Sequence, residues 1–266
     1  MNRIALLLLS YLMTRACLPW SLRLMKVRGL TSLNYLGCSL PAPAGLIPVI
    51  VSLVLFALIG EKTILFLALT VALLGLLDDL KGEPSHKGFR GHLTALKQGR
   101  VTTGFLKAAG GFMLALAGAW SLGNPALAVF LVNTLLIALM TNFLNLMDLR
   151  PGRAAKVFIT GSALLVMAVP QNSPAWLFIA LGAAVAYLPH DLHMKSMLGD
   201  TGANFWGFLL GLAGAASLSF QIKALLVMLL IGIHLYAEKY SISQFIEKTP
   251  WLNYLDRLGR PDYGGS

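Results

Sequence analysis

Residues 63–81 read TILFLALTVALLGLLDDLK, a mostly apolar run that ends in two adjacent carboxylates, Asp78 and Asp79. A helix that crosses a bilayer needs about 20 mostly apolar residues. A charged side chain at the bilayer centre costs about 2.5–3.5 kcal/mol. The stretch therefore predicts a membrane span whose acidic end lies at the border of the hydrocarbon.

The rest of the chain has the same character. Of 266 residues, 57% are hydrophobic and only 12% are charged, whereas a soluble domain is about 25% charged. This composition excludes a disordered chain, a coiled coil, a collagen and a disulfide-rich scaffold. We predict an all-α, polytopic integral membrane protein, with one transmembrane domain over residues 1–240 and a cytoplasmic C-terminal tail over 241–266. About nine transmembrane helices are expected, at residues 4–22, 44–60, 63–77, 103–122, 125–146, 155–169, 175–189, 203–220 and 222–238.

The basic residues predict the orientation of these spans. Sixteen of the 21 Lys and Arg residues fall on the side that holds residues 23–43, 78–102, 147–156, 189–202 and the tail. Cytoplasmic connectors carry an excess of Lys and Arg, so this side is predicted to be cytoplasmic and the N-terminus to be outside. The spread of the charges over many connectors argues against nucleic acid as a partner.

Three polar clusters lie at the predicted cytoplasmic ends of separate spans. Asp78 and Asp79 form the first cluster. The second has Asn142, Asn145 and Asp148 at helical spacing, and the third is Gly199-Asp200-Thr201-Gly202. Each has an ordinary explanation: a solvated helix end, interhelical hydrogen bonds, and an N-cap, respectively. Taken together, we expect them to form one site, in which oxygen ligands and substrate phosphates hold Mg²⁺.

Other residues are weaker candidates. Lys107 lies within an apolar run, where a lysine either snorkels or meets an anion. The connector over 78–102 is basic. Either the excess of basic residues in cytoplasmic connectors is the whole explanation, or this connector attracts a phosphate group. His190 and His193 flank Asp191 with the spacing of a metal pair, but no third ligand stands beside them.

The clusters resemble, in order and spacing, the polyprenyl-phosphate N-acetylhexosamine-1-phosphate transferases of glycosyltransferase family 4. This family includes phospho-N-acetylmuramoyl-pentapeptide-transferase and the UDP-GlcNAc:undecaprenyl-phosphate GlcNAc-1-phosphate transferases. The resemblance covers about residues 30–240. It rests on the first inner loop (34–37 and 41–45), Gly75–Asp79, Asn142–Asp148 and Gly199–Gly202.

The resemblance implies a reaction. The protein would transfer a sugar-1-phosphate from a UDP-amino sugar to a polyprenyl phosphate such as undecaprenyl phosphate. The reaction would occur at the cytoplasmic face of the cell membrane, for cell-wall or peptidoglycan synthesis, and a homodimer is a further expectation. Mg²⁺, with Mn²⁺ as the alternative ion, would be held by Asn145 and Asp200. The residues assigned to catalysis are Asp78, Asp79, Asp148 and Lys107, and those assigned to substrate binding are Asn142, Arg150, Arg153 and Asp191.

The sequence also departs from the family pattern. A second aspartate is usual where Pro151 stands, and Arg150 and Arg153 flank that position. Residues 239–266 contain no histidine, although the last inner loop of the family usually carries a His-x-His motif. We expect the two arginines to grip the diphosphate in place of the missing residues. The alternative is a catalytically impaired relative that binds a lipid-linked precursor or scaffolds an envelope complex. An intramembrane aspartyl protease and a transporter fit the sequence less well.

Overall fold

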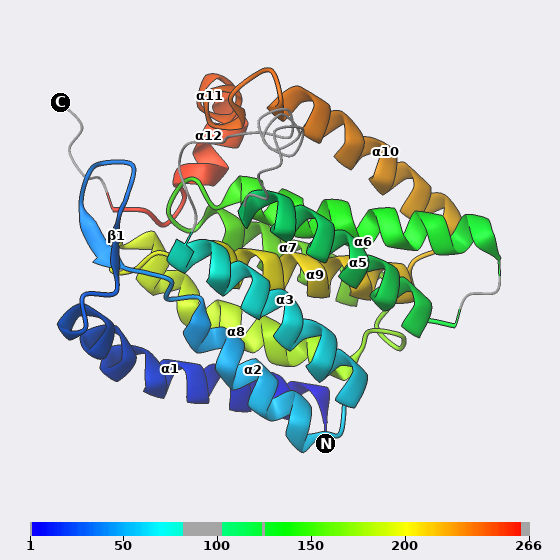
Figure 1. Cartoon of the computed structure of the whole chain (residues 1–266), viewed down its shortest axis with the longest axis horizontal. Coiled ribbons are helices and arrows are strands. Elements are labelled where there is room, and N and C mark those ends of the chain that lie inside the picture. The colour runs from blue at the N-terminus through cyan, green and yellow to red at the C-terminus, as the bar shows by residue number, and fades with distance from the viewer. Residues whose placement is uncertain (1, 82–102, 124–125, 262–266) are drawn as a thin grey trace.

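The computed structural model describes residues 2–81, 103–123 and 126–261, and of residues 103–107 it describes the backbone alone. Within these ranges a long helix occupies each of the nine predicted segments (Figure 1). These helices are α1 (Arg3–Val27), α2 (Leu46–Leu58), α3 (Lys62–Lys81), α5 (Thr103–Ser121), α6 (Leu127–Met147), α7 (Arg153–Ala168), α8 (Ala175–Leu192), α9 (Gly199–Ser217) and α10 (Phe220–Ala237).

Five of these helices, α1, α3, α6, α8 and α10, are long and apolar enough to cross a membrane. The segments Leu46–Leu58 and Ala108–Ser121 are apolar but shorter. The protein is therefore a helical, multi-pass membrane protein. The number of nine spans and their orientation stay predictions.

Several helices extend beyond the predicted spans, and this changes where the acids lie. Helix α3 continues to Lys81, α8 continues to Leu192, and α9 begins at Gly199 instead of at residue 203. Asp79, Asp191 and Asp200 therefore lie in the terminal turns of helices and not in flexible connectors. A helix end holds a side chain in a more fixed direction than a connector does, so the site is built on rigid elements.

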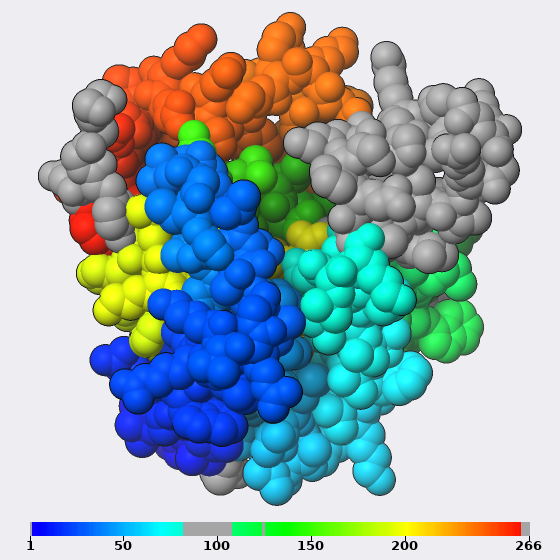
Figure 2. All heavy atoms as spheres, turned by 60° about the vertical axis from the view of Figure 1, so that its left-hand side comes forward, coloured from blue at the N-terminus to red at the C-terminus, as the bar shows by residue number. Residues whose placement is uncertain are grey.

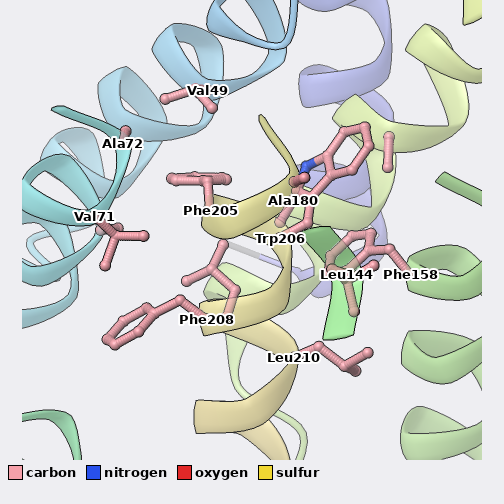
Figure 3. Packing of buried hydrophobic residues seen from close by; sticks show 14 of the residues in the cluster. Val49, Val71, Ala72, Leu144, Phe158, Ala180, Phe205, Trp206, Phe208 and Leu210 are labelled. Carbon is pink, nitrogen blue, oxygen red and sulfur yellow. The ribbon is translucent and has the colours of Figure 1, made fainter. Parts of the chain in front are cut away.

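Helix α9 is the central element. Every residue from Thr201 to Ala215 is buried, and Figure 3 shows Phe205, Trp206 and Phe208 of this helix among side chains of its neighbours. The Trp206 ring stacks on Phe158 of α7, with ring centroids 5.4 Å apart. Lipid tails are as apolar as leucine, so close packing and not burial from water holds membrane helices together.

Small residues bring α9 and α6 into close contact. A methyl group added at Gly207 would lie 2.7 Å from the Met140 carbonyl oxygen and 2.7 Å from the Cα of Thr141. One added at Gly211 would lie 2.8 Å from the Cα of Ile137. The four-residue spacing of Gly207 and Gly211 thus makes a seam in which backbone meets backbone.

Two smaller elements lie near the cytoplasmic end predicted for these helices. An antiparallel hairpin pairs β1 (Thr31–Leu33) with β2 (Ser39–Pro41), so the all-α prediction missed a short sheet. The Asn34 side chain closes its turn by accepting hydrogen bonds from the N–H groups of Leu36 and Cys38, both at 2.9 Å. This is an ordinary role for asparagine in turns.

The predicted C-terminal tail forms two short helices, α11 (Ile242–Lys248) and α12 (Pro250–Arg257). An ion pair at α12 attaches the tail to the start of α7. Arg153 donates from Nε and a terminal nitrogen to both carboxylate oxygens of Asp256, at 2.8 and 2.9 Å, and both side chains are buried. Arg260 also contacts Asp256 at 2.8 Å.

Candidate functional site

The three polar clusters of the sequence meet at the first turn of α9. Asp79, in the last turn of α3, accepts hydrogen bonds at 2.8 Å from the backbone N–H groups of Asp200 and Thr201. It also accepts one from the Thr201 hydroxyl at 2.6 Å. Asp148, the residue that ends α6, accepts from the N–H of Gly199 at 3.1 Å. Figure 2 shows the start of α9, in gold, between the hairpin, in blue, and the end of α3, in cyan.

These contacts identify the group that caps α9. The first N–H groups of a helix have no partner within the helix, and the positive end of the helix dipole favours a negative charge. Asp79 and Asp148 satisfy three consecutive N–H groups here. The residue before α9, Leu198, provides no side-chain cap. The alternative explanation of Asp200 as an ordinary N-cap is therefore wrong, because Asp79 of another helix accepts the hydrogen bonds of the first N–H groups of α9.

Glycines allow this approach of backbones. A methyl group at Gly75 of α3 would lie 2.6 Å from the Asp200 carbonyl oxygen. Gly199 has φ +76°, a left-handed conformation that glycine adopts without strain. A Cβ at Gly199 would also lie 2.9 Å from the Asp79 carboxylate. Both glycines are therefore required for Asp79 to reach the N-terminus of α9.

Charge is concentrated at this point. Burial, and then the carboxylates of Asp191, Asp200 and Asp79, raise the pKa of Asp148 well above its ordinary value. Like-charged carboxylates so close to one another favour a cation between them. Mg²⁺ suits such a set, since it prefers oxygen ligands and is bound by one or two carboxylates together with substrate phosphates. In the described residues, no three Asp, Glu, His or Cys side chains are placed so that they could hold a metal ion by themselves.

The other predicted site residues differ in burial and in whether they line a cavity. On α6, Asn142 is exposed and lies about two turns before Asp148, and Asn145 is half-buried and lies about one turn before it. Asp191 is buried, and its Oδ2 has no hydrogen-bond partner. Asp148, Arg150 and Asp191 line one small cavity of about 50 Å³, together with Asn34 and Tyr35 of the hairpin. That volume is below the range of small-molecule sites, about 300–1,000 Å³.

The two arginines have separate environments. Arg150 lies over the Tyr35 ring, 4.2 Å from its centroid, and contacts Glu247 of α11 at 2.9 Å. Arg153 does not line the cavity. Its guanidinium is buried against Asp256 and against the Ser243 hydroxyl, 3.0 Å away. Arg153 therefore anchors the tail. This environment differs from the predicted diphosphate contact, because the guanidinium is buried and is paired with both carboxylate oxygens of Asp256.

Two predicted features lie outside the described residues. They are the Lys107 side chain and the basic connector within 78–102, apart from its first residues in α3.

The sequence model of Glycosyl transferase family 4 matches residues 62–218, which is more than half of the chain and runs from the start of α3 to the end of α9. The chain belongs to this family. A comparison with curated proteins found no match.

Membership places the chain among transferases that move a sugar phosphate to a lipid carrier in the membrane. The matched residues include all three clusters that meet at α9. The hairpin and the C-terminal tail lie outside the match, yet Tyr35 and Glu247 both contact Arg150. No local pattern in the sequence indicated a partner for Asp256, which stands beside Arg257 and Arg260 in the tail.

Proposed function

We propose that this glycosyl transferase family 4 protein transfers a sugar-1-phosphate from a UDP-amino sugar to a polyprenyl phosphate, at the cytoplasmic face of the membrane. One observation carries the proposal: carboxylates of α3 and α6 hold the first turn of α9 and surround Asp200. A scaffold protein has no use for acids gathered at the border of a membrane, where their charge is costly.

Mg²⁺, when bound by Asn145 and Asp200, would neutralise charge on the diphosphate of the donor. Asp79 acts through Asp200 as a positioning residue, since its carboxylate fixes the backbone of Asp200 and Thr201. Asp78, the neighbouring carboxylate, would receive the proton of the acceptor phosphate. Asp148 and Asp191 line the adjoining cavity together with Arg150.

The acceptor phosphate enters from the bilayer, and one of its oxygens attacks the sugar-bearing phosphorus of the donor. The new P–O bond forms as the bond to the uridine monophosphate oxygen breaks, and UMP leaves with the electron pair. A phosphate monoester has a second pKa near 6, so the acceptor needs little help in losing its proton. Positioning and charge neutralisation supply most of the rate acceleration.

Arg150 is the residue in the described cavity that suits the donor phosphates. The planar guanidinium makes bidentate contacts to phosphate, and Tyr35 and Glu247 hold it at the cavity from two sides. Arg150→Ala is expected to raise the KM for the donor more than it lowers kcat. An unchanged KM would show that Arg150 does not bind the donor. The matched control is Arg257→Ala, which replaces an exposed arginine of the tail.

Product analysis tests the reaction. The full-length protein in lipid would be incubated with Mg²⁺, undecaprenyl phosphate and a panel of UDP-sugars, and lipid products would be identified by mass spectrometry. A product with the mass of one prenyl diphosphate sugar would establish the reaction and name the donor. Folded protein that binds the lipid and yields no product with any donor would favour the catalytically impaired relative.

A further inference from the structure

A second polar recess lies on the other side of α8 from the candidate active site. It lies between α1 and α8, which run side by side (Figure 1). Its volume is about 450 Å³, within the range of small-molecule sites, about 300–1,000 Å³. Arg15 and Pro19 of α1 line one wall, and the residues of the other wall are Pro189, His190, His193 and Lys195. Four of these six residues are basic or histidine, and none is acidic.

The polar groups of the recess are available to a ligand. Arg15 and Lys195 are exposed, and no ion pair joins either of them to an acid in the described part of the chain. The His190 side chain is half-buried and lines the recess, although its Nδ1 atom is buried and has no hydrogen-bond partner. Nδ1 of His193 contacts the Pro189 carbonyl oxygen at 2.7 Å, so its ring is held at the wall.

The α8 wall of the recess lies at the predicted depth of lipid headgroups. Arg15, on the α1 wall, lies deeper, within the predicted span over residues 4–22, where an arginine snorkels toward the headgroups. Both α1 and α8 are candidate membrane spans, and His190 lies two residues before the end of α8. Its neighbour Asp191 lines the cavity of the candidate active site, so the two sites lie at the same level of the membrane. Trp20, next to Pro19, is 69% exposed, and tryptophan is enriched at membrane–water interfaces.

From these observations we infer that the recess between α1 and α8 binds the phosphate group of an anionic ligand at headgroup level, a site separate from that of the sugar-phosphate transfer. Basic pockets between transmembrane helices bind lipid headgroups, and arginine binds phosphate in bidentate fashion. The phosphate belongs either to an anionic phospholipid or to a free anion. The inference does not depend on the proposed reaction.

Native mass spectrometry of the full-length protein in detergent tests this site. The protein would be titrated with phosphatidylglycerol, with zwitterionic phosphatidylcholine, and with phosphatidylglycerol in the presence of inorganic phosphate. The test variant is Arg15→Gln with Lys195→Gln. The matched control is Arg23→Gln with Lys26→Gln, which removes two exposed basic residues from the same α1 outside the recess.

The affinity for the tightest-bound phosphatidylglycerol should fall about thirtyfold in the test variant, because each of the two basic residues contributes about fivefold near a membrane surface. It should change little in the control variant, and phosphatidylcholine should not replace phosphatidylglycerol. Competition by inorganic phosphate would assign the site to phosphate in general, and lack of competition would assign it to the lipid. Equal losses in both variants, or no loss in the test variant, would overturn the inference. Both substitutions are at exposed side chains, and an unchanged Tm would show that the fold is intact.

Discussion

Asp79 and Asp200 divide two tasks that the sequence alone could not separate. The carboxylate of Asp79 accepts three hydrogen bonds from the first turn of α9, so its charge is used to hold the backbone. Asp200 is held by those bonds, and its side chain is not needed as the cap. Adjacent Asp78 and Asp79 have the same chemistry, and only the packing of α3 against α9 distinguishes them.

Thr201→Val tests this arrangement at a single hydroxyl. Valine has nearly the same shape but removes the 2.6 Å hydrogen bond to the Asp79 carboxylate. A hydrogen bond to a charged group contributes about 1.5–3 kcal/mol to stability, so a measurable fall in Tm is expected, together with lower transfer activity. Thr70→Val is the control, since the Thr70 hydroxyl bonds to the Phe66 carbonyl of its own helix. Equal Tm values for the two variants would contradict the role given to Asp79.

At the scale of elements, the seam between α6 and α9 sets the distance between the clusters of these two helices. Gly207→Val places a side chain against the backbone of Met140 and Thr141, and overpacking of this kind costs about 1–3 kcal/mol. Helix α9 should shift relative to α6, and both Tm and transfer activity should fall. Gly232→Val in α10 is the matched control, because a Cβ there meets nothing within 4 Å. Comparable losses of Tm and activity in both variants would show that a valine within any helix causes the loss, and not the contact between α6 and α9.

The attachment of α12 to α7 depends on the charge of Asp256. Burial alone would raise the pKa of this carboxyl, but the guanidiniums of Arg153 and Arg260 outweigh it and hold the pKa below its ordinary value. The ion pair therefore stabilises the folded state fully above the unfolded-state pKa, about 3.9. This stability is lost as the pH falls through the lower folded-state pKa. We expect the tail to detach in acid and to remain attached at neutral pH.

Asp256→Asn should detach the tail at neutral pH, because removal of one partner of a buried ion pair costs about 3–5 kcal/mol. Detachment is measured by the hydrogen exchange of residues 250–257, for the variant at neutral pH and for the wild type in acid. The exchange rates are corrected for the intrinsic effect of pH. Glu247→Gln, which breaks the more exposed pair with Arg150, should cost at most about 1 kcal/mol. Slow exchange of α12 in Asp256→Asn would show that other contacts hold the tail.

For the whole molecule, the sequence was sufficient to predict the long helices and the meeting of the three polar clusters. Long apolar runs predict spans without knowledge of their neighbours, and the four-residue spacing of Gly207 and Gly211 is typical of the close helix contact that the structure has there. The hairpin was missed because strands of three residues have no detectable alternation. The pairing of Arg153 with Asp256 was missed because nothing local links residues 103 positions apart.

The orientation of the whole molecule is tested with its own cysteines. Cys38, in the hairpin, is exposed and is predicted to be cytoplasmic. In a Cys17→Ala background, a membrane-impermeant maleimide should label Cys38 in inverted vesicles and not in intact cells. Gln171→Cys, between α7 and α8, should show the opposite pattern in a background without Cys17 and Cys38. Labelling of Cys38 in intact cells would reverse the orientation proposed for the active site.

The central claim is that carboxylates meeting at the start of α9 make one centre for phosphate transfer. The most direct test is the rate of UMP release by the wild type and by Asp200→Asn, with Mg²⁺, undecaprenyl phosphate and the preferred UDP-sugar. Asparagine keeps the size of the side chain and removes its charge. We expect Mg²⁺-dependent release by the wild type. We expect Asp200→Asn to release UMP at least about 100-fold more slowly with an unchanged Tm, which is the scale of losing one electrostatic group of a catalytic site. Release at the wild-type rate by Asp200→Asn would show that the charge of Asp200 has no part in the transfer.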